Sequence, residues 1–168
     1  TPLYFLLRVC IACREDHAAA AVCFGLAIQA NPCKASYYLH RAHCYGKLNL
    51  WERSVEDYLI ALDLVPGNPL AHFNCALALE HLFEYDLALD SMNAALDCAP
   101  GHDIAEEKII EIRLSRAFLF RKLQRNQDAL QEYGTILTLD PSNVKVVCGT
   151  PPGCRILSLT RGDMGEKE

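Results

Sequence analysis

The spacing of proline is the feature that most restricts what this chain can fold into. Pro32, Pro66 and Pro100 are thirty-four residues apart, and each follows a segment with a helical composition. Pro141 stands forty-one residues after Pro100. Proline ends a helix because it has no backbone N–H to donate and its ring clashes with the preceding turn. A constant period of this length therefore predicts an array of similar helical units.

The blocks between the prolines carry the same residue types at matching places. Large side chains, small side chains and the proline follow in one order, at Tyr38, Ala42, Tyr45, Ser54, Tyr58, Ala61 and Pro66, then at His72, Ala76, Leu79, Ala88, Met92, Ala95 and Pro100, and last at Arg113, Ala117, Phe120, Ala129, Tyr133, Ile136 and Pro141. Spacings of three and four residues place these side chains on one face, so the pattern predicts amphipathic helices. The small residues would let paired helices approach closely.

This order resembles the tetratricopeptide repeat, a helix-turn-helix unit. The resemblance covers residues 1–143 and implies an all-α fold, a right-handed superhelical solenoid of antiparallel helix pairs. The repeats are expected at about residues 1–34, 35–68, 69–102 and 103–143. One such pair cannot bury its own apolar face, so the pairs must stack. Residues 144–168, which contain the run Gly149-Thr-Pro-Pro-Gly153, are expected to form an irregular or disordered tail.

Two departures from the repeat stand out. Arg8 occupies the position of the small residue in the first repeat, and seven added residues, 103–109, precede the last repeat without a helix breaker. Seven residues make about two helical turns, which predicts an elongated first helix in that repeat. No polar capping helix is evident after Pro141, so the last repeat could expose an apolar edge through which the chain self-associates.

The resemblance implies that the first helix of each repeat lines a concave groove, and that the chain is a non-catalytic scaffold binding a partner peptide or helix there. The groove residues expected on this basis are Leu39, His40, His43, Phe73, Asn74, Leu77, His81, Leu114, Phe118, Arg121 and Lys122. Phe73 and Phe118 would be the apolar anchors, with polar residues around them. The alternative is that both rings pack between adjacent repeats as core.

The best-known ligand of this family is the acidic C-terminal tail of heat-shock chaperones, held by lysine, asparagine and arginine on three successive first helices. If repeats two to four supply these helices, the corresponding positions are Leu39, His43, Asn74, Glu111 and Ser115, and only Asn74 agrees. If repeats one to three supply them, the positions are Phe5, Val9, His40, Leu70 and Asn74, and none agrees. A double carboxylate needs cationic donors. A co-chaperone adaptor is therefore the alternative function rather than the first.

Charge is distributed unevenly along the chain. Residues 52–107 hold twelve acidic side chains against Arg53 alone, whereas residues 108–125 hold six basic side chains against Glu111 alone. This asymmetry could steer a bipolar partner or orient self-stacking, or it could reflect solvated helix faces. The overall net charge of −5 disfavours nucleic acid as a partner.

Nine scattered cysteines predict reduced thiols in the cytosol or the nucleus, and we expect a cytoplasmic protein. The only C-x-x-C is Cys10 and Cys13, and it lacks the context of a redox or zinc site. A zinc set could in principle be assembled from His40, His43, Cys44, His72, Cys75 and His81. No catalytic motif is present, so we expect no catalytic residue, metal or cofactor. A metal- or thiol-dependent enzyme is the alternative from another class.

The longest apolar run, residues 18–28, is too short to span a membrane. Because the chain begins at Thr1, it is expected to be a piece of a longer protein.

Overall fold

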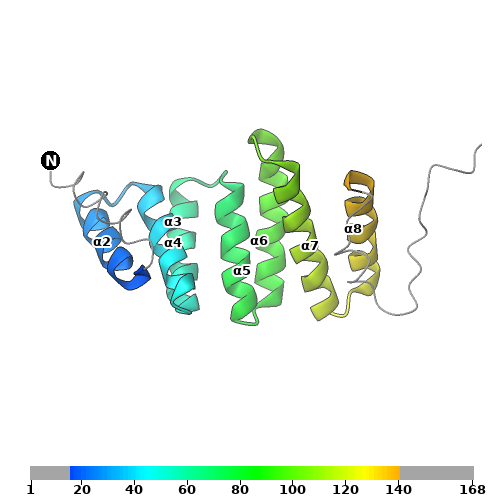
Figure 1. Cartoon of the computed structure of the whole chain (residues 1–168), viewed down its shortest axis with the longest axis horizontal. Helices are drawn as coiled ribbons and strands as arrows, with labels where there is room; N and C mark the ends of the chain where they lie inside the picture. Colours follow the sequence, from blue (N-terminus) through cyan, green and yellow to red (C-terminus); the bar gives the residue numbers. More distant parts are fainter. Residues whose placement is uncertain (1–15, 141–168) are drawn as a thin grey trace, which may run out of the picture.

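The computed structural model of this chain describes residues 16–140, and this part of the chain is all-α. Its seven α-helices lie side by side in one row, with α2 at one end and α8 at the other (Figure 1). A short 3₁₀-helix, η1, follows α6. The helices are α2 (His17–Ala30), α3 (Ala35–Lys47), α4 (Trp51–Leu64), α5 (Pro69–His81), α6 (Tyr85–Cys98), η1 (Ala99–Gly101), α7 (Glu106–Lys122) and α8 (Asn126–Leu139). The expectations for Arg8, for the first helix of repeat one and for the tail fall on residues outside the described range.

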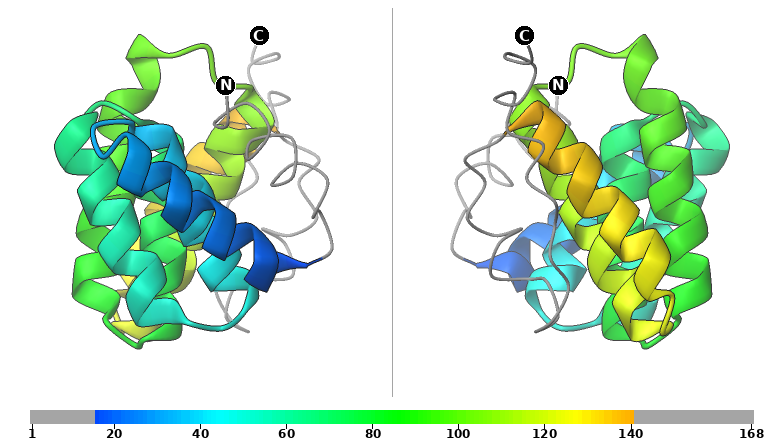
Figure 2. Two further views of the ribbon diagram at one scale, coloured as in Figure 1. Left: turned by 90° about the vertical axis from the view of Figure 1, so that its left-hand side faces the viewer. Right: turned by 90° about the vertical axis from the view of Figure 1, so that its right-hand side faces the viewer.

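Each helix packs mainly against its neighbours in sequence. Short turns join α3 to α4, α5 to α6 and α7 to α8, and each of these pairs packs as an antiparallel hairpin. The hairpins are stacked through contacts of α2 with α3, α4 with α5 and α6 with α7. Figure 2 views this stack from its two ends, with α2 in front in one view and α8 in front in the other. No helix in residues 16–140 is long and apolar enough to cross a membrane.

Small residues stand where the helices of a pair approach most closely. Ala42, Ala76, Ala88 and Ala117 are all completely buried. Ser54 is the polar member of this set, and its hydroxyl donates a hydrogen bond of 2.8 Å to the carbonyl of Ala42. This bond satisfies the buried hydroxyl, so a serine is accepted where the matching positions carry alanine.

The core has two parts. The main cluster runs through α3 to α8, and its largest fully buried side chains include Phe73, Met92, Ile112, Leu119 and Ile136. A smaller cluster joins α2 to α3 and consists of three alanines and Cys44 around the rings of Phe24 and Tyr37. Within residues 16–140, the α2 end of the row therefore has the smaller cluster of buried apolar side chains.

The turn inside each hairpin contains one residue with left-handed backbone geometry. Asn49, Phe83 and Gln124 have φ values of 59°, 63° and 61°. They occupy the same position of successive repeats, at separations of thirty-four and forty-one residues. A side chain with a Cβ disfavours this conformation, and asparagine tolerates it better than most. Phe83 is therefore the least suited of the three to its turn.

The added residues before the last hairpin only partly lengthen its first helix. α7 has seventeen residues, against thirteen in α3 and in α5, and residues 106–109 form its extra turn. Residues 103–105 lie outside the helix, in the connection after η1. The reason is upstream: Pro100 and Gly101 make the 3₁₀ turn, and the backbone of Ala105 at φ −58° and ψ 142° is not helical.

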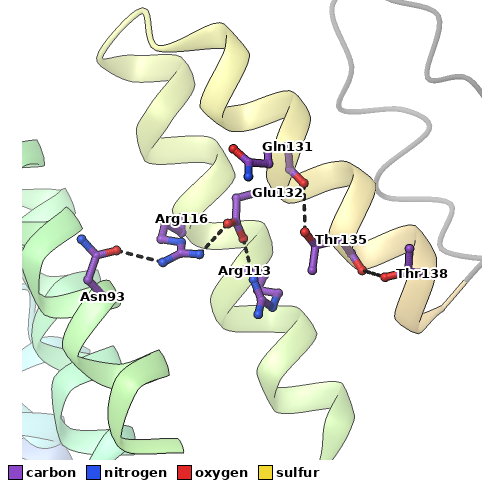
Figure 3. A network of polar contacts seen from close by, with 7 residues as sticks. All are labelled: Asn93, Arg113, Arg116, Gln131, Glu132, Thr135 and Thr138. Carbon is purple, nitrogen blue, oxygen red and sulfur yellow. Dashed lines mark hydrogen bonds and ion pairs between the residues drawn. The ribbon is translucent and has the colours of Figure 1, made fainter.

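Polar pairs join the two helices of a hairpin at matching positions. In the first complete hairpin, the guanidinium of Arg41 donates to both carboxylate oxygens of Asp57, each at 2.7 Å. In the last, Arg116 donates to Glu132, and Arg113 donates to the other oxygen of the same carboxylate (Figure 3). These hydrogen bonds satisfy carboxylates that are almost completely buried.

Candidate peptide-binding site

A pocket of about 240 Å³ opens between α3, α4 and α5, and we name it the α3–α5 pocket. Its volume suits one side chain of a peptide rather than a larger ligand. Four of the sequence-predicted groove residues line it, namely His43, Asn74, Leu77 and His81. The other lining residues are Gly46, Lys47, Trp51, Ser54, Tyr58 and Ala78.

Trp51 and His81 form one wall of this pocket. Their rings are stacked, with centroids 3.8 Å apart and planes inclined by 8°. Trp51 is the first residue of α4 and His81 is the last residue of α5. The sequence prediction missed Trp51, Ser54 and Tyr58 because it assigned the groove to first helices alone. The signal that could have found Trp51 is its place directly after a turn, as the chain's single tryptophan.

The predicted histidines of α3 make ring contacts with α2. The ring of His40 stacks on Phe24 with centroids 5.3 Å apart, and the ring of His43 meets the ring of His17 edge-on at 6.5 Å. Partial burial lowers the pKa of His43, and the nearby charge of Lys47 lowers it further. His43 is therefore neutral at pH 7, with one ring nitrogen to donate and one to accept a hydrogen bond.

A second pocket, of about 340 Å³, lies at the turn between α7 and α8 and is named the α7–α8 pocket. It brings together the predicted residues Phe118, Arg121 and Lys122 with Gln124 and Asn126. The ammonium of Lys122 lies 5.0 Å from the centroid of the Phe118 ring. Phe118 is 38% exposed, so its ring remains accessible to a ligand.

Phe73 is not available as an anchor, and the prediction that it contacts a ligand is wrong. Its side chain is 1% exposed and belongs to the main core. The ammonium of Lys108, from the extra turn of α7, lies 4.8 Å from the centroid of the Phe73 ring. The packing alternative therefore holds for Phe73 but not for Phe118. Leu39, Leu77 and Leu114 are half-buried against the same core.

Glu80 lies close enough to a lining residue of each pocket for their charges to influence its pKa. Burial raises the pKa of this α5 carboxyl, and the charges of His81 and Lys122 act in the opposite direction. His81 lines the α3–α5 pocket and Lys122 lines the α7–α8 pocket. Both pockets therefore lie on the side of the stack where α3, α5 and α7 end.

The histidines and cysteines considered for metal or thiol chemistry can be assessed only within residues 16–140, since Cys10 and Cys13 lie outside the described range. Within residues 16–140, no three histidine, cysteine or acidic side chains are grouped so as to hold a metal ion. Burial raises the pKa of the Cys75 thiol to about 11 and also raises the pKa of Cys44. Both thiols are therefore protonated at neutral pH, which is the less reactive form of cysteine.

Known proteins resemble this chain in its repeats. No protein-family model matches the chain. A TPR repeat-containing protein of Methanocaldococcus jannaschii is 39% identical over 69 residues, which are 41% of this chain and 11% of that protein. Sperm-associated antigen 1 of Rattus norvegicus is 30% identical over 97 residues, or 58% of this chain and 11% of that protein. The chain thus spans only about a tenth of these relatives.

Solved structures match the arrangement of the helices. The crystal structure of MamA protein superposes with a TM-score of 0.75 at 12% identity, over 86% of this chain and 76% of that one. The first TPR of Spaghetti (RPAP3), solved bound to the HSP90 peptide SRMEEVD, gives a TM-score of 0.60 at 22% identity, over 69% of this chain and 86% of that one. The described helices therefore have the fold of tetratricopeptide repeat structures. The hairpins α3–α4, α5–α6 and α7–α8 are successive helix pairs of this fold, and the α3–α5 pocket bridges the first two of them.

Proposed function

We propose that this chain is a tetratricopeptide repeat protein that acts as a non-catalytic interaction scaffold and binds an extended segment of a partner protein across the C-terminal halves of α3, α5 and α7. The observation that carries the proposal is the α3–α5 pocket, to which two successive repeats contribute side chains. A partner segment lying along the repeats would place one side chain in this pocket. Repeat arrays commonly use such extended surfaces for binding.

The chemistry of the two pockets supports this end of the helices as the contact region. The stacked rings of Trp51 and His81 provide a flat apolar wall, and the amide of Asn74 can both donate to and accept from a peptide backbone. In the α7–α8 pocket, Phe118 provides an exposed ring beside cations. Phe73 offers no contact to a partner, because its ring is buried and the ammonium of Lys108 lies over it.

A peptide selection with a matched pair of variants tests the proposal. Peptides are selected from a random displayed library on the wild-type chain, and their affinities are then measured by calorimetric titration. Leu77→Glu places a charge in the α3–α5 pocket, whereas Leu87→Glu changes a side chain on α6 that is 54% exposed. We expect Leu77→Glu to weaken binding at least about tenfold, which corresponds to roughly 1.4 kcal/mol. Leu87→Glu should bind as the wild type does.

Trp51→Ala provides a second disruption of the same pocket, and circular dichroism confirms that each variant is folded. Equal affinities of the selected peptides for the wild type, Leu77→Glu and Trp51→Ala would disprove the proposed site. So would a comparable loss of affinity in Leu87→Glu, since that surface lies on another helix.

The alternative function is binding of an acidic chaperone tail. It is favoured by the likeness to the RPAP3 domain solved with the HSP90 peptide and by the presence of Asn74 in the α3–α5 pocket. It is opposed by Leu39, Glu111 and Ser115, which offer no cation at the positions where this family's clamp has them. A titration with the peptide SRMEEVD decides the matter. Micromolar binding that Asn74→Ala abolishes would place this function first.

A cytoplasmic location belongs to the same proposal. The argument for this location is that the cysteines are expected to form no disulfides. The cysteines within residues 16–140 are all free in this structure, namely Cys23, Cys33, Cys44, Cys75 and Cys98. Free thiols are typical of reducing compartments. Fractionation of cells that express a tagged chain, followed by detection in the cytosolic fraction, is the measurement that checks this location.

A further inference from the structure

The polar cluster between α6, α7 and α8 has one more positive charge than negative charge. Arg113 and Arg116 of α7 both donate to Glu132 of α8, at 3.2 Å and 2.5 Å (Figure 3). Arg116 also donates to the side-chain oxygen of Asn93 on α6, at 2.9 Å. Two guanidinium groups therefore share one carboxylate, and the fourth side chain of the cluster is neutral.

The arginines of this cluster retain donors that have no acceptor. Each guanidinium carries five N–H groups, and the bonds described above use only some of them. The Nε atoms of Arg113 and Arg116 are buried without a hydrogen-bond partner. The side chains of the two arginines are still 24% and 17% exposed, whereas that of Glu132 is 9% exposed. Solvent or a ligand can therefore reach the arginines, but the carboxylate is largely covered.

The repeat formed by α3 and α4 has equal numbers of positive and negative charges at the matching positions. Tyr38, Arg41 and Asp57 stand seventy-five residues before Arg113, Arg116 and Glu132, respectively. There one arginine meets one carboxylate through two bonds of 2.7 Å. Tyr38, at the position of Arg113, is neutral, and its ring lies 5.7 Å from the guanidinium carbon of Arg41. The unbalanced charge of the last repeat thus comes from a single replacement, arginine for tyrosine.

The cluster lies on the opposite side of α7 from the proposed peptide-binding surface. Successive helical residues are rotated by about 100°, so Arg113 and Arg116 project away from Leu114 and Phe118. A ligand at the arginines would therefore not compete for either pocket.

We propose that Arg113 and Arg116 form a binding site for an oxyanion, a carboxylate or a phosphate group, supplied in addition to Glu132. An anion bound to these partly exposed arginine side chains would balance the charge of the cluster and accept hydrogen bonds from N–H groups that neither Glu132 nor Asn93 uses. The repeat formed by α3 and α4 has no such site, because its one arginine, Arg41, is already paired with Asp57.

The test titrates the wild-type chain with inorganic phosphate and, separately, with glutarate, while chloride holds the ionic strength constant. The arginine Nε–Hε signals are followed by nuclear magnetic resonance and the unfolding midpoint by circular dichroism. We expect saturable shifts of the Arg113 and Arg116 signals and a rise in the midpoint of about 3 °C at ten times the dissociation constant. A response to phosphate alone assigns a phosphoryl group as the ligand, and a response to glutarate alone assigns a partner's carboxylate.

Two reciprocal variants use the repeat as its own control. Arg113→Tyr copies the side chains of repeat two and should remove the response, whereas Tyr38→Arg should give Arg41 a response that the wild type lacks. The proposal is overturned if neither anion shifts the Arg113 and Arg116 signals of the wild type. It is also overturned if a folded Arg113→Tyr responds as the wild type does. Because the peptide-binding pockets lie on the other side of α7, failure here leaves the proposed function intact, and the reverse also holds.

Discussion

Individual residues decide how well each repeat fits its turn. The left-handed position inside the hairpins is occupied by Asn49, Phe83 and Gln124, with nearly equal φ values. For a residue with a large side chain this conformation is disfavoured by about 1–2 kcal/mol relative to helical geometry. Phe83 is 75% exposed, so its ring gains little burial to offset that disadvantage.

Phe83→Asn should therefore stabilise the chain, by about 0.5–1 kcal/mol. The gain is reduced by loss of the edge-on contact between the Phe83 and Tyr85 rings. Urea unfolding followed by circular dichroism measures the change. The reciprocal variant Asn49→Phe should lower stability, because it introduces the less suitable residue into the matching turn. If both variants shift stability in the same direction, turn geometry is not the cause.

The protonation of His43 should make stability depend on pH. Its pKa is lowered in the folded chain by partial burial and by Lys47, so the unfolded chain takes up the proton more readily. Stability is then fully present above the ordinary histidine pKa of about 6.5, and it is lost as the pH falls below that value and through the lowered pKa of the folded chain. His43→Gln should remove this part of the acid sensitivity. The measurement compares the unfolding free energies of the two chains at pH 8 and pH 5.5, and a constant difference would contradict the prediction.

The sequence period predicts position better than it predicts exposure. It assigns His43, Asn74, Leu77 and His81 to one surface, and these four residues line one pocket, because a fixed repeat gives each of them a known side of its helix. The period cannot predict that Phe73 is buried and Phe118 exposed, because burial depends on which side chains of a neighbouring helix pack against each ring. The Phe73 ring belongs to the main core, and the ammonium of Lys108 reaches it from the extra turn of α7. Lys108 thus lies in the one segment that departs from the period.

Pairs of helices are joined differently in successive repeats. Arg41 and Asp57 link α3 to α4 by a double hydrogen bond, whereas the matching positions of the next repeat carry the uncharged residues Cys75 and Ser91. The hydrogen bonds to Asp57, together with its charge, raise the pKa of Arg41 above its ordinary value. No periodicity in apolar residues reveals these pairs, because they interrupt the apolar pattern rather than extend it.

Removing one partner of the first pair should destabilise the chain strongly. Asp57→Asn leaves a partly buried guanidinium without its counter-charge, and we expect a loss of about 2–3 kcal/mol. The double variant Arg41→Met with Asp57→Leu replaces both charges by apolar side chains and should recover most of that loss. Chemical denaturation of the wild type, both single variants and the double variant provides the cycle. A double variant that is less stable than either single variant would refute this account.

At the scale of the whole molecule, stability should vary along the row of helices. The middle of the stack shares the main core, while α2 contributes to the smaller cluster around Phe24 and Tyr37. Repeat proteins are stabilised by each unit and its nearest neighbours. Among the helices of residues 16–140, α2 packs mainly against α3, so its local unfolding can leave the rest of the described row folded.

We accordingly expect the amides of α2 to exchange with solvent faster than those of α5 and α6. Hydrogen exchange of the native chain, read by mass spectrometry of peptides, measures the difference. The expected order is lowest protection in α2 and highest in α5 and α6, where neighbours pack on both sides. Uniform protection from α2 to α8 would show instead that the row unfolds as a single unit.

The stacked rings of Trp51 and His81 also give the molecule a built-in optical reporter. Trp51 is the only tryptophan in the sequence, and its indole forms a wall of the α3–α5 pocket. All tryptophan emission from the chain therefore originates at the surface proposed to receive the partner. A ligand that enters the pocket or separates the two rings must change the polarity around this one fluorophore, so that binding can be followed without attaching a dye.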